Sequence, residues 1–185
     1  MKILVTGTTG GIGGAVAQAA RAAGHEVVEW NRDGFDRGGE LPPGPYDGVV
    51  FATGMCPVAP VAALTDKSFA ETLRVNCGLF LRIVREIVAR RLYPPKGARI
   101  VAVSSVSANE GWPGGAAYCA SKGALSAMCR ALDAELAPRR ISVRAVEPRY
   151  VKTKMFDACA GRMGVSAALA RDPRDLAAEI LALLG

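Results

Sequence analysis

The first thirty residues constrain the fold most strongly, because a short apolar run meets a cluster of glycines and is followed by a helical pattern. Residues 2–6 are mostly apolar and lead directly into the glycines, which is typical of a buried parallel strand. Residues 13–23 carry apolar side chains at helical spacing, and Gly24 follows where helices commonly end on glycine. Residues 25–30 are predicted to form a second strand. The chain therefore begins as strand, glycine turn, helix and strand.

The remaining sequence continues this alternation of strands and helices. Residues 31–46 are polar and rich in glycine and proline, which predicts a loop. Further strands are expected at 47–52, 99–104 and 141–146, and further helices at 65–75, 76–91 and 118–137. Asp172 and Pro173 fit the N-cap and the first position of a final helix. The pattern predicts an α/β fold of the Rossmann type: a doubly wound parallel sheet with helices on both faces and a ligand site at the carboxyl ends of its strands.

The glycine turn is suited to the pyrophosphate of a dinucleotide. Glycines let the backbone approach the phosphates closely, and the N–H groups and dipole of the following helix then hold their charge. Such turns also occur without ligands, but the position of this one in a strand–helix–strand unit favours binding. The candidate cofactor-binding residues of the turn are Gly7, Thr8, Thr9, Gly11, Ile12 and Gly13.

A tyrosine and a lysine form the candidate catalytic pair. Tyr118 and Lys122 share a face of the predicted helix because they are four residues apart. A nearby ammonium stabilises a phenolate and lowers a pKa that is ordinarily about 10, as a general acid working near neutral pH requires. Ser105 precedes the pair at the end of an apolar strand. The spacing alone is weak evidence, since it arises by chance in many helices.

Taken together, these motifs resemble the short-chain dehydrogenase/reductase family over about residues 1–155. The matching residues, in order, are Gly7, Gly11, Gly13, Asn76, Ser105, Tyr118 and Lys122. The resemblance implies that Tyr118 exchanges a proton with a substrate carbonyl oxygen that Ser105 holds by a hydrogen bond. It also implies that Lys122 lowers the pKa of the tyrosine and binds the nicotinamide ribose, and that Asn76 holds a water linking Lys122 to solvent.

The resemblance extends to two further cofactor segments. One follows the third predicted strand and the other follows the last predicted strand, along the nicotinamide side. Their implied cofactor-binding residues are Ala52, Thr53, Gly54, Pro148, Val151 and Thr153, together with Tyr118 and Lys122. The family likeness implies oxidoreduction between a carbonyl and an alcohol on a small molecule, with the hydride supplied by a nicotinamide cofactor.

Cofactor preference depends on the end of the second strand. A carboxylate there would bind the ribose 2′-hydroxyl of NAD, whereas this chain has the neutral Asn31 followed by Arg32. A guanidinium suits a 2′-phosphate because its donors form a rigid fork. We therefore expect NADP(H), with NAD(H) as the alternative because Asp33 lies close enough to change the register. Arg32 could also be a solvated loop charge.

The sequence departs from the family pattern in three places, one of which is residues 51–54, where Phe-Ala-Thr-Gly replaces the usual Asn-Asn-Ala-Gly. The stretch from Arg32 to Asp47 is too short for the usual helix, strand and helix, and the chain ends at Gly185 before the usual last strand. The sheet is therefore expected to be shortened at both edges. Arg149 follows Pro148 where the family has glycine. Its side chain could crowd the nicotinamide pocket or reach toward a phosphate.

Composition excludes several other classes of protein. The net charge of +6 comes from arginines spread along the chain, so we expect no nucleic-acid partner. No stretch suits a signal peptide or a membrane span, and the 5 cysteines lack metal-ligand spacing. We expect a cytoplasmic protein with no metal, forming a single domain over 1–185. A small lid at about 155–172 is expected to select the substrate through Phe156, Met163 and Leu169.

Two expectations concern assembly and an alternative function. The apolar faces of helices 76–91 and 118–137 are too wide for one side of a sheet, so we expect a two-fold homodimer through them and not a tetramer. The alternative to an enzyme is a catalytically weak dinucleotide-binding sensor or partner protein. The shortened cofactor edge favours that alternative, whereas the complete set of Asn76, Ser105, Tyr118 and Lys122 favours the enzyme.

Overall fold

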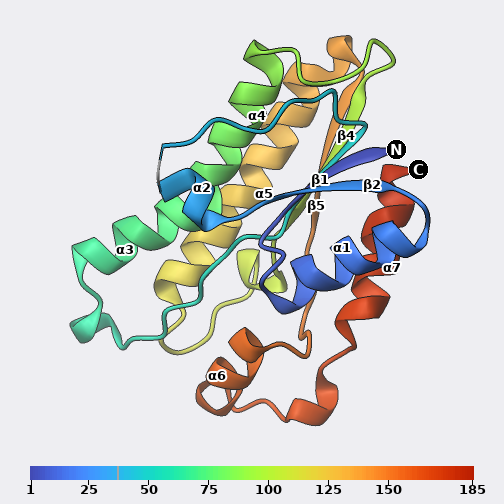
Figure 1. Ribbon diagram of the computed structural model, residues 1–185. Helices are drawn as coiled ribbons and strands as arrows, with labels where there is room; N and C mark the ends of the chain where they lie inside the picture. Colours follow the sequence, from blue (N-terminus) through green and yellow to red (C-terminus); the bar gives the residue numbers. More distant parts are fainter. Residues whose placement is uncertain (37) are drawn as a thin grey trace.

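A parallel five-stranded sheet forms the centre of the molecule (Figure 1). The computed structural model describes residues 1–36 and 38–185, without the side chains of Arg32 and Asp33. The strands are β1 (Lys2–Thr6), β2 (Glu26–Trp30), β3 (Gly48–Phe51), β4 (Ala98–Val103) and β5 (Ile141–Val146). Their order is β2-β1-β3-β4-β5, so the chain reverses direction across the sheet between β1 and β3. The predicted fold class, with a sheet short at both edges, is confirmed.

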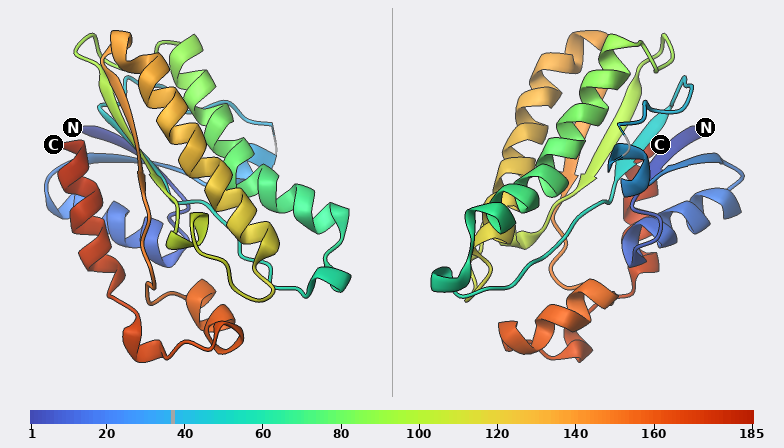
Figure 2. Two further views of the ribbon diagram at one scale, coloured as in Figure 1. Left: turned by 180° about the vertical axis from the view of Figure 1, so that it is seen from behind. Right: turned by 60° about the vertical axis from the view of Figure 1, so that its left-hand side comes forward.

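Helices cover both faces of the sheet (Figures 1 and 2). One face carries α3 (Asp66–Leu73), α4 (Leu79–Ala89) and α5 (Ala116–Leu136), and the other carries α1 (Gly11–Ala22) and α7 (Pro173–Leu184). A short α2 (Arg32–Asp36) follows β2, and α6 (Lys154–Met163) lies beyond the carboxyl ends of the strands. Two separate apolar clusters, one on each face, make up the core. Both clusters leave the carboxyl edge of the sheet free to form a site.

The sequence predicts most elements to within two residues. Helix 13–23 begins two residues earlier, at Gly11, and strand 141–146 has the expected bounds. The Asp172 carboxylate accepts a hydrogen bond from the backbone N–H of Arg174 at 2.8 Å, as an N-cap does. The prediction of a loop over 31–46 is wrong in part because α2 forms there. The ring of Phe35 is buried and packs edge-on against Trp30, with 5.8 Å between ring centres.

The predicted helices 65–75 and 76–91 form one continuous helical segment. A π-helical turn over Arg74–Gly78 joins α3 to α4, so the expected break before Asn76 is absent. Such turns insert an extra residue and are common at functional sites. Asn76 lies within this turn and is completely buried. The irregular turn thus points a polar amide into the protein.

The wide apolar face expected to need a partner is covered inside the chain. The α4 side chains behind that expectation are buried against the sheet, namely Leu79, Phe80, Ile83, Val84 and Ile87. On α5, Leu125, Cys129 and Leu136 are also buried. Leu81 remains 41% exposed on the outer side. The reason given for a dimer is therefore largely wrong, and the dimer itself stays a prediction.

Within the described residues, no helix has the length and apolar character to cross a membrane.

Candidate active site

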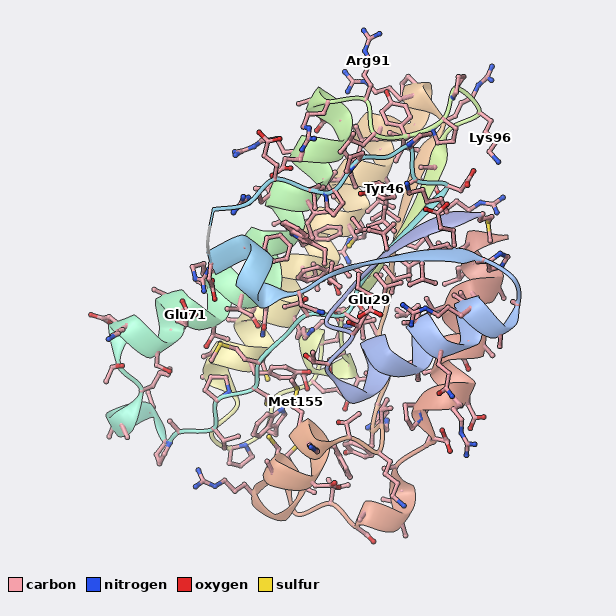
Figure 3. The ribbon with its side chains drawn as sticks, viewed as in Figure 1. Glu29, Tyr46, Glu71, Arg91, Lys96 and Met155 are labelled. Atoms are coloured by element: carbon pink, nitrogen blue, oxygen red, sulfur yellow. The ribbon has the colours of Figure 1, made fainter. Side chains whose placement is uncertain are left out.

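A cavity of about 420 Å³ lies between the carboxyl ends of the strands and the lid helix α6. The predicted site residues that line it are Ile12, Ala52, Gly54, Ser105, Tyr118, Lys122, Pro148, Val151 and Thr153. Figure 3 shows Met155 of α6 where the lid faces the sheet, and this side chain also lines the cavity. A larger hollow of about 680 Å³ at the opposite ends of the strands contains none of the predicted site residues.

The glycine turn has the geometry that close approach of a pyrophosphate requires. Gly7 adopts φ +69°, and a Cβ there would lie 2.7 Å from the carbonyl oxygen of Ala52. A Cβ on Gly13 would overlap the carbonyl oxygen of Gly7. A Cβ on Gly11 would lie 2.6 Å from Thr153, so the turn touches the segment that follows β5. The backbone around the first turn of α1 therefore fits a dinucleotide.

Asn31 is held against this turn. Its side-chain oxygen accepts a hydrogen bond from the Thr8 backbone N–H at 2.9 Å, and its amide donates to the Thr8 hydroxyl at 2.9 Å. Thr9 is exposed at the tip of the turn. The side chain of Arg32 lies outside the described part of the structure. The cofactor preference inferred from Arg32 is therefore not tested.

Sequence analysis missed a carboxylate beside the turn. Glu29 on β2 accepts hydrogen bonds from the Thr8 hydroxyl and from Arg21 (Figure 3). The hydrogen bond from Arg21, followed by that from Thr8, lowers the pKa of the Glu29 carboxyl below its usual range. An ionised carboxylate thus lies near Asn31, and Arg21 offsets its charge. Glutamate on an exposed strand position gave no sequence signal of this role.

The segment after β3 connects the cofactor turn to the catalytic group. The Thr53 hydroxyl donates to Thr6 at 2.9 Å and is buried, so this side chain does not form part of the cavity wall. A Cβ on Gly54 would lie 3.5 Å from the Asn76 side-chain oxygen and 3.7 Å from the Lys122 ammonium. Gly54 therefore keeps the backbone close to both polar side chains.

Strand β4 and helix α5 bring the catalytic candidates together. Ser105 follows the end of β4, and its hydroxyl oxygen accepts a hydrogen bond from the Ser107 backbone N–H at 3.1 Å. The neighbouring Ser104 hydroxyl donates to the Lys122 backbone carbonyl at 3.1 Å, which ties β4 to α5. Tyr118 and Lys122 lie on the α5 face that meets the cavity. The predicted convergence of serine, tyrosine and lysine is observed.

Lys122 is buried, and its ammonium has a backbone partner. The Nζ atom donates to the Val103 carbonyl oxygen at 2.7 Å and lies 5.6 Å from the centre of the Tyr118 ring. Burial disfavours the charged form and lowers the pKa of Lys122 from 10.5 to about 8. The contact with Val103 fixes the ammonium behind the phenol.

The expectation that Lys122 lowers the pKa of Tyr118 is not met in this structure. Burial raises the pKa of the phenol above its ordinary value, the nearby Cys56 thiol raises it further, and a hydrogen bond with Ser105 offsets part of the rise. The physical reason is that burial disfavours the charged phenolate, and this is the largest effect on the pKa of Tyr118. Tyr118 is thus a protonated phenol at neutral pH.

Asn76 binds protein groups on both sides of its amide. Its oxygen accepts from the Met55 backbone N–H at 2.8 Å, and its nitrogen donates to the Met55 carbonyl at 2.9 Å and to the Ser121 hydroxyl at 2.8 Å. The π-helical turn thereby holds both the loop after β3 and the catalytic helix. The water expected at Asn76 stays a prediction.

Arg149 lines the cavity, one of the two placements considered from sequence, and its charge is paired there. Its guanidinium forms two hydrogen bonds to the Glu110 carboxylate, at 2.6 and 3.0 Å, at the rim of the cavity. It also lies over the Tyr150 ring, 5.9 Å from the ring centre. The pair joins the loop after β4 to the loop after β5, and nothing in the sequence distinguished Glu110 as the partner.

The lid is a segment whose two ends are hydrogen-bonded to one another. Its two ends meet where the Lys152 N–H donates to the Arg171 carbonyl at 2.9 Å and the Arg171 N–H donates to the Tyr150 carbonyl at 3.0 Å. Phe156 and Met163 line the cavity as expected, whereas Leu169 is 67% exposed and lies outside it. Sequence analysis missed Cys159 of the lid as a cavity residue, and also Cys56 and Trp112 from other segments.

Known proteins with this sequence pattern are oxidoreductases. The chain is 28% identical to the 3-oxoacyl-[acyl-carrier-protein] reductase FabG of Aggregatibacter actinomycetemcomitans, across 99% of this chain and 91% of that protein. It is 31% identical to the L-xylulose reductase of Bos taurus, across 85% of this chain and 74% of that protein. These relatives differ in substrate, so they establish a reaction type more than a ligand.

Solved structures and a family model agree with these relatives. A structure described as an NAD(P) dependent gluconate 5-dehydrogenase of Beutenbergia cavernae, with bound NADP, superposes with a TM-score of 0.81 at 26% identity, over 98% of this chain and 87% of that one. The 4-hydroxyisoleucine dehydrogenase complexed with NADH has a TM-score of 0.83 at 22% identity over 100% of this chain and 90% of that one, which shows the shared fold. A model of the short chain dehydrogenases matches residues 40–162, and the chain belongs to this family of oxidoreductases.

Proposed function

We propose that the protein is an NADP(H)-dependent enzyme that interconverts a carbonyl and an alcohol on a small molecule, with Tyr118 as the acid/base. One observation carries the proposal. Ser105, Tyr118 and Lys122 line the same cavity as Ile12 and Thr153, which border the glycine turn. A nicotinamide cofactor supplies the hydride when it is bound. The same cavity therefore offers a place for the cofactor beside a proton donor.

The protein residues have separate roles in the reduction direction. Ser105 holds the substrate carbonyl oxygen, and the Tyr118 hydroxyl transfers its proton to that oxygen. A phenol whose pKa is raised is protonated at neutral pH, which suits it for donation. Lys122 positions the nicotinamide ribose and replaces the proton that the tyrosine loses. Asn76 orients the loop after β3 and the helix that carries Tyr118.

NADP(H) is the proposed cofactor. Asn31 supports this choice because it places a neutral amide, and not a carboxylate, against Thr8 at the end of β2. Among the described side chains, Glu29 is a competing charge beside the turn, and Arg21 neutralises it. NAD(H) remains the alternative. We further propose a cytoplasmic homodimer through helices 76–91 and 118–137, with no nucleic-acid partner.

The test is a measurement of turnover in a variant that lacks only the phenol oxygen of Tyr118. With a panel of ketones and aldehydes, NADPH oxidation is followed by absorbance, and Tyr118→Phe is expected to lower turnover by about a hundredfold or more because the proton donor is gone. The NADPH dissociation constant is expected to change little. Tyr93→Phe, far from the cavity, serves as the matched control. A Tyr118→Phe variant that keeps more than a tenth of wild-type turnover contradicts the assignment.

A second candidate function is a dinucleotide-binding sensor with weak catalysis. The short connection from β2 to β3 favours it, because the charged contacts beside β2 are exposed ion pairs. Binding of NADPH without turnover of any carbonyl in the panel would support this candidate. Turnover abolished by Tyr118→Phe would exclude it.

A further inference from the structure

The cavity wall that faces Tyr118 is apolar and rich in sulfur. It is formed by Cys56, Trp112, Met155, Cys159, Met163 and Val165. Cys159 donates a weak hydrogen bond to the Cys56 carbonyl across 3.8 Å, so the lid and the loop after β3 touch. Burial raises the pKa of the Cys56 thiol, which is therefore uncharged at neutral pH. The wall thus offers hydrocarbon and neutral sulfur to a substrate.

Most polar side chains of the described cavity wall already have partners within the protein. The Ser104 hydroxyl donates to the Lys122 carbonyl, and the Ser107 oxygen accepts from the Trp112 indole at 3.2 Å. The Thr153 oxygen accepts from the Phe156 N–H at 3.2 Å. The hydroxyls of Ser105 and Tyr118 are hydrogen-bonded to one another, and the proposed function assigns this pair to the substrate oxygen. The cavity therefore offers few polar groups beyond the pair that recognises this oxygen.

The charged side chains around the cavity are also matched. Arg149 and Glu110 neutralise one another through two hydrogen bonds. Arg162 of the lid donates to the Val58 carbonyl at 2.9 Å. Within the described residues, the wall has no basic side chain free to pair with an anionic substrate apart from Lys122, which the Val103 carbonyl already engages. A buried carboxylate without a partner is strongly disfavoured.

We propose that the substrate is an uncharged, largely apolar carbonyl compound, whose single oxygen meets Ser105 and Tyr118 and whose hydrocarbon body packs against the sulfur-rich wall. The inference rests on the proposed function, since it takes these two hydroxyls to bind a carbonyl. A sugar would leave several hydroxyls without hydrogen-bond partners, which costs affinity. The chain would thus differ in substrate from the relative named for a sugar.

Three probes of graded polarity test the proposal by steady-state kinetics with NADPH. 2-Octanone and 7-oxooctanoate share a methyl ketone and differ at the far end, where one has a methyl group and the other a carboxylate. L-Xylulose supplies a ketone with several hydroxyls. We expect kcat/KM for 2-octanone to exceed that of either other probe by at least tenfold. Equal or faster reduction of the carboxylate or the sugar overturns the proposal while leaving the oxidoreductase function intact.

Binding separates this inference from catalysis. Trp30→Phe removes one of the two tryptophans and leaves Trp112 as the fluorescent probe. NADP⁺ has no hydride to give to a ketone, so the probes bind without turnover and Tyr118 is kept. In saturating NADP⁺, 2-octanone is expected to quench Trp112 fluorescence saturably, and the other two probes at least tenfold less tightly. Quenching by 2-octanone with no reduction of any probe by the wild type supports the substrate class and contradicts the enzyme. No quenching by 2-octanone, or equal quenching by all three, overturns the inference.

The ion pair at the rim gives a gain-of-function test. Glu110→Gln leaves the Arg149 guanidinium without its carboxylate, so kcat/KM for 7-oxooctanoate is expected to rise at least fivefold relative to 2-octanone. Glu179→Gln is the matched control. It also removes a carboxylate from an ion pair, between Glu179 of α7 and Arg171, but neither residue lines the cavity. An unchanged ratio in Glu110→Gln contradicts the claim that the neutralised rim excludes anions.

Discussion

The two ends of the cofactor cleft are built by different means. At the catalytic end, Asn76 and Lys122 are buried and their polar atoms are hydrogen-bonded to backbone or to other buried side chains. At the adenosine end, beside β2, the charged contacts are ion pairs between exposed side chains, such as Arg21 with Glu29 and Arg74 with Asp36, while Phe35 packs into the core. The charged groups of the first region lie in the interior, and those of the second lie at the surface.

This difference determines which region tolerates change. Removing one partner of a buried polar contact leaves the other without water, at a cost of about 1–3 kcal/mol. Exposed ion pairs each contribute about 0–1 kcal/mol and weaken in salt. The catalytic end should therefore fail as a unit when one residue changes. The adenosine end should change by small, separable steps that adjust cofactor choice.

The largest effect is expected from Lys122→Met, which removes a buried charge that contacts Val103 and neighbours Tyr118. Turnover is expected to fall by about two orders of magnitude, and the NADPH dissociation constant to rise, because the ammonium serves both proton supply and ribose binding. Single-turnover kinetics and a binding titration measure the two effects. A change in turnover alone, or in the NADPH dissociation constant alone, would contradict the conclusion that the catalytic end acts as one unit.

The same variant makes a statement about pH and stability. The pKa of Lys122 is lowered from 10.5 to about 8, so between these values the unfolded chain holds the proton that the folded chain has released. Lys122 alone should therefore make the free energy of unfolding rise as pH increases from 8 to 10.5, while below pH 8 the full cost of burying the ammonium is present. Buried thiols and phenols such as Cys56, Cys129 and Tyr118 have raised pKa values and act in the opposite direction over this range. In urea unfolding, stability should therefore fall more steeply with pH in Lys122→Met than in the wild type, and Lys67→Met, on the exposed side of α3, should follow the wild type.

A smaller effect is expected at the adenosine end from Asn31→Asp. The new carboxylate would repel a 2′-phosphate and accept a hydrogen bond from a 2′-hydroxyl, so the ratio of NADPH to NADH affinity should fall by about tenfold, near ~1.4 kcal/mol. Fluorescence titrations with both cofactors measure it. Gln18→Glu adds the same charge on the exposed side of α1 and should leave the ratio unchanged. A similar fall of the affinity ratio in both variants would show a long-range electrostatic effect and not a contact between residue 31 and the ribose.

The smallest expected change concerns assembly. Light scattering at micromolar concentration is expected to give twice the monomer mass for the wild type. Leu81→Lys, on the outer side of α4, should lower the measured mass to that of a monomer. Turnover should change by less than twofold, because the catalytic contacts lie within one chain. A wild-type monomer refutes the dimer. A large loss of turnover on dissociation would mean that the catalytic end depends on its partner.

The sequence predicted the parts of the site that depend on local spacing. Tyr118 and Lys122 lie one helical turn apart, and the glycines follow a strand, so their placement required only regular geometry. The ion pair of Glu110 with Arg149 and the contact of Glu29 with Thr8 join segments distant in sequence, and no periodicity relates such partners. The direction of the Tyr118 pKa shift was wrong for a similar reason. Burial of the phenol by distant segments raises this pKa, and local spacing does not reveal such burial.

The closed ends of the lid separate the specificity of this protein from its chemistry. The backbone contacts at Lys152 and Arg171 fix where the excursion leaves and rejoins the fold, whatever lies between. Because the entropy of closing a loop grows only with the logarithm of its length, doubling it costs about 0.6 kcal/mol. Insertions and deletions between these residues can therefore accumulate during evolution without moving Tyr118. A chain of this kind can acquire new substrates by exchanging one segment.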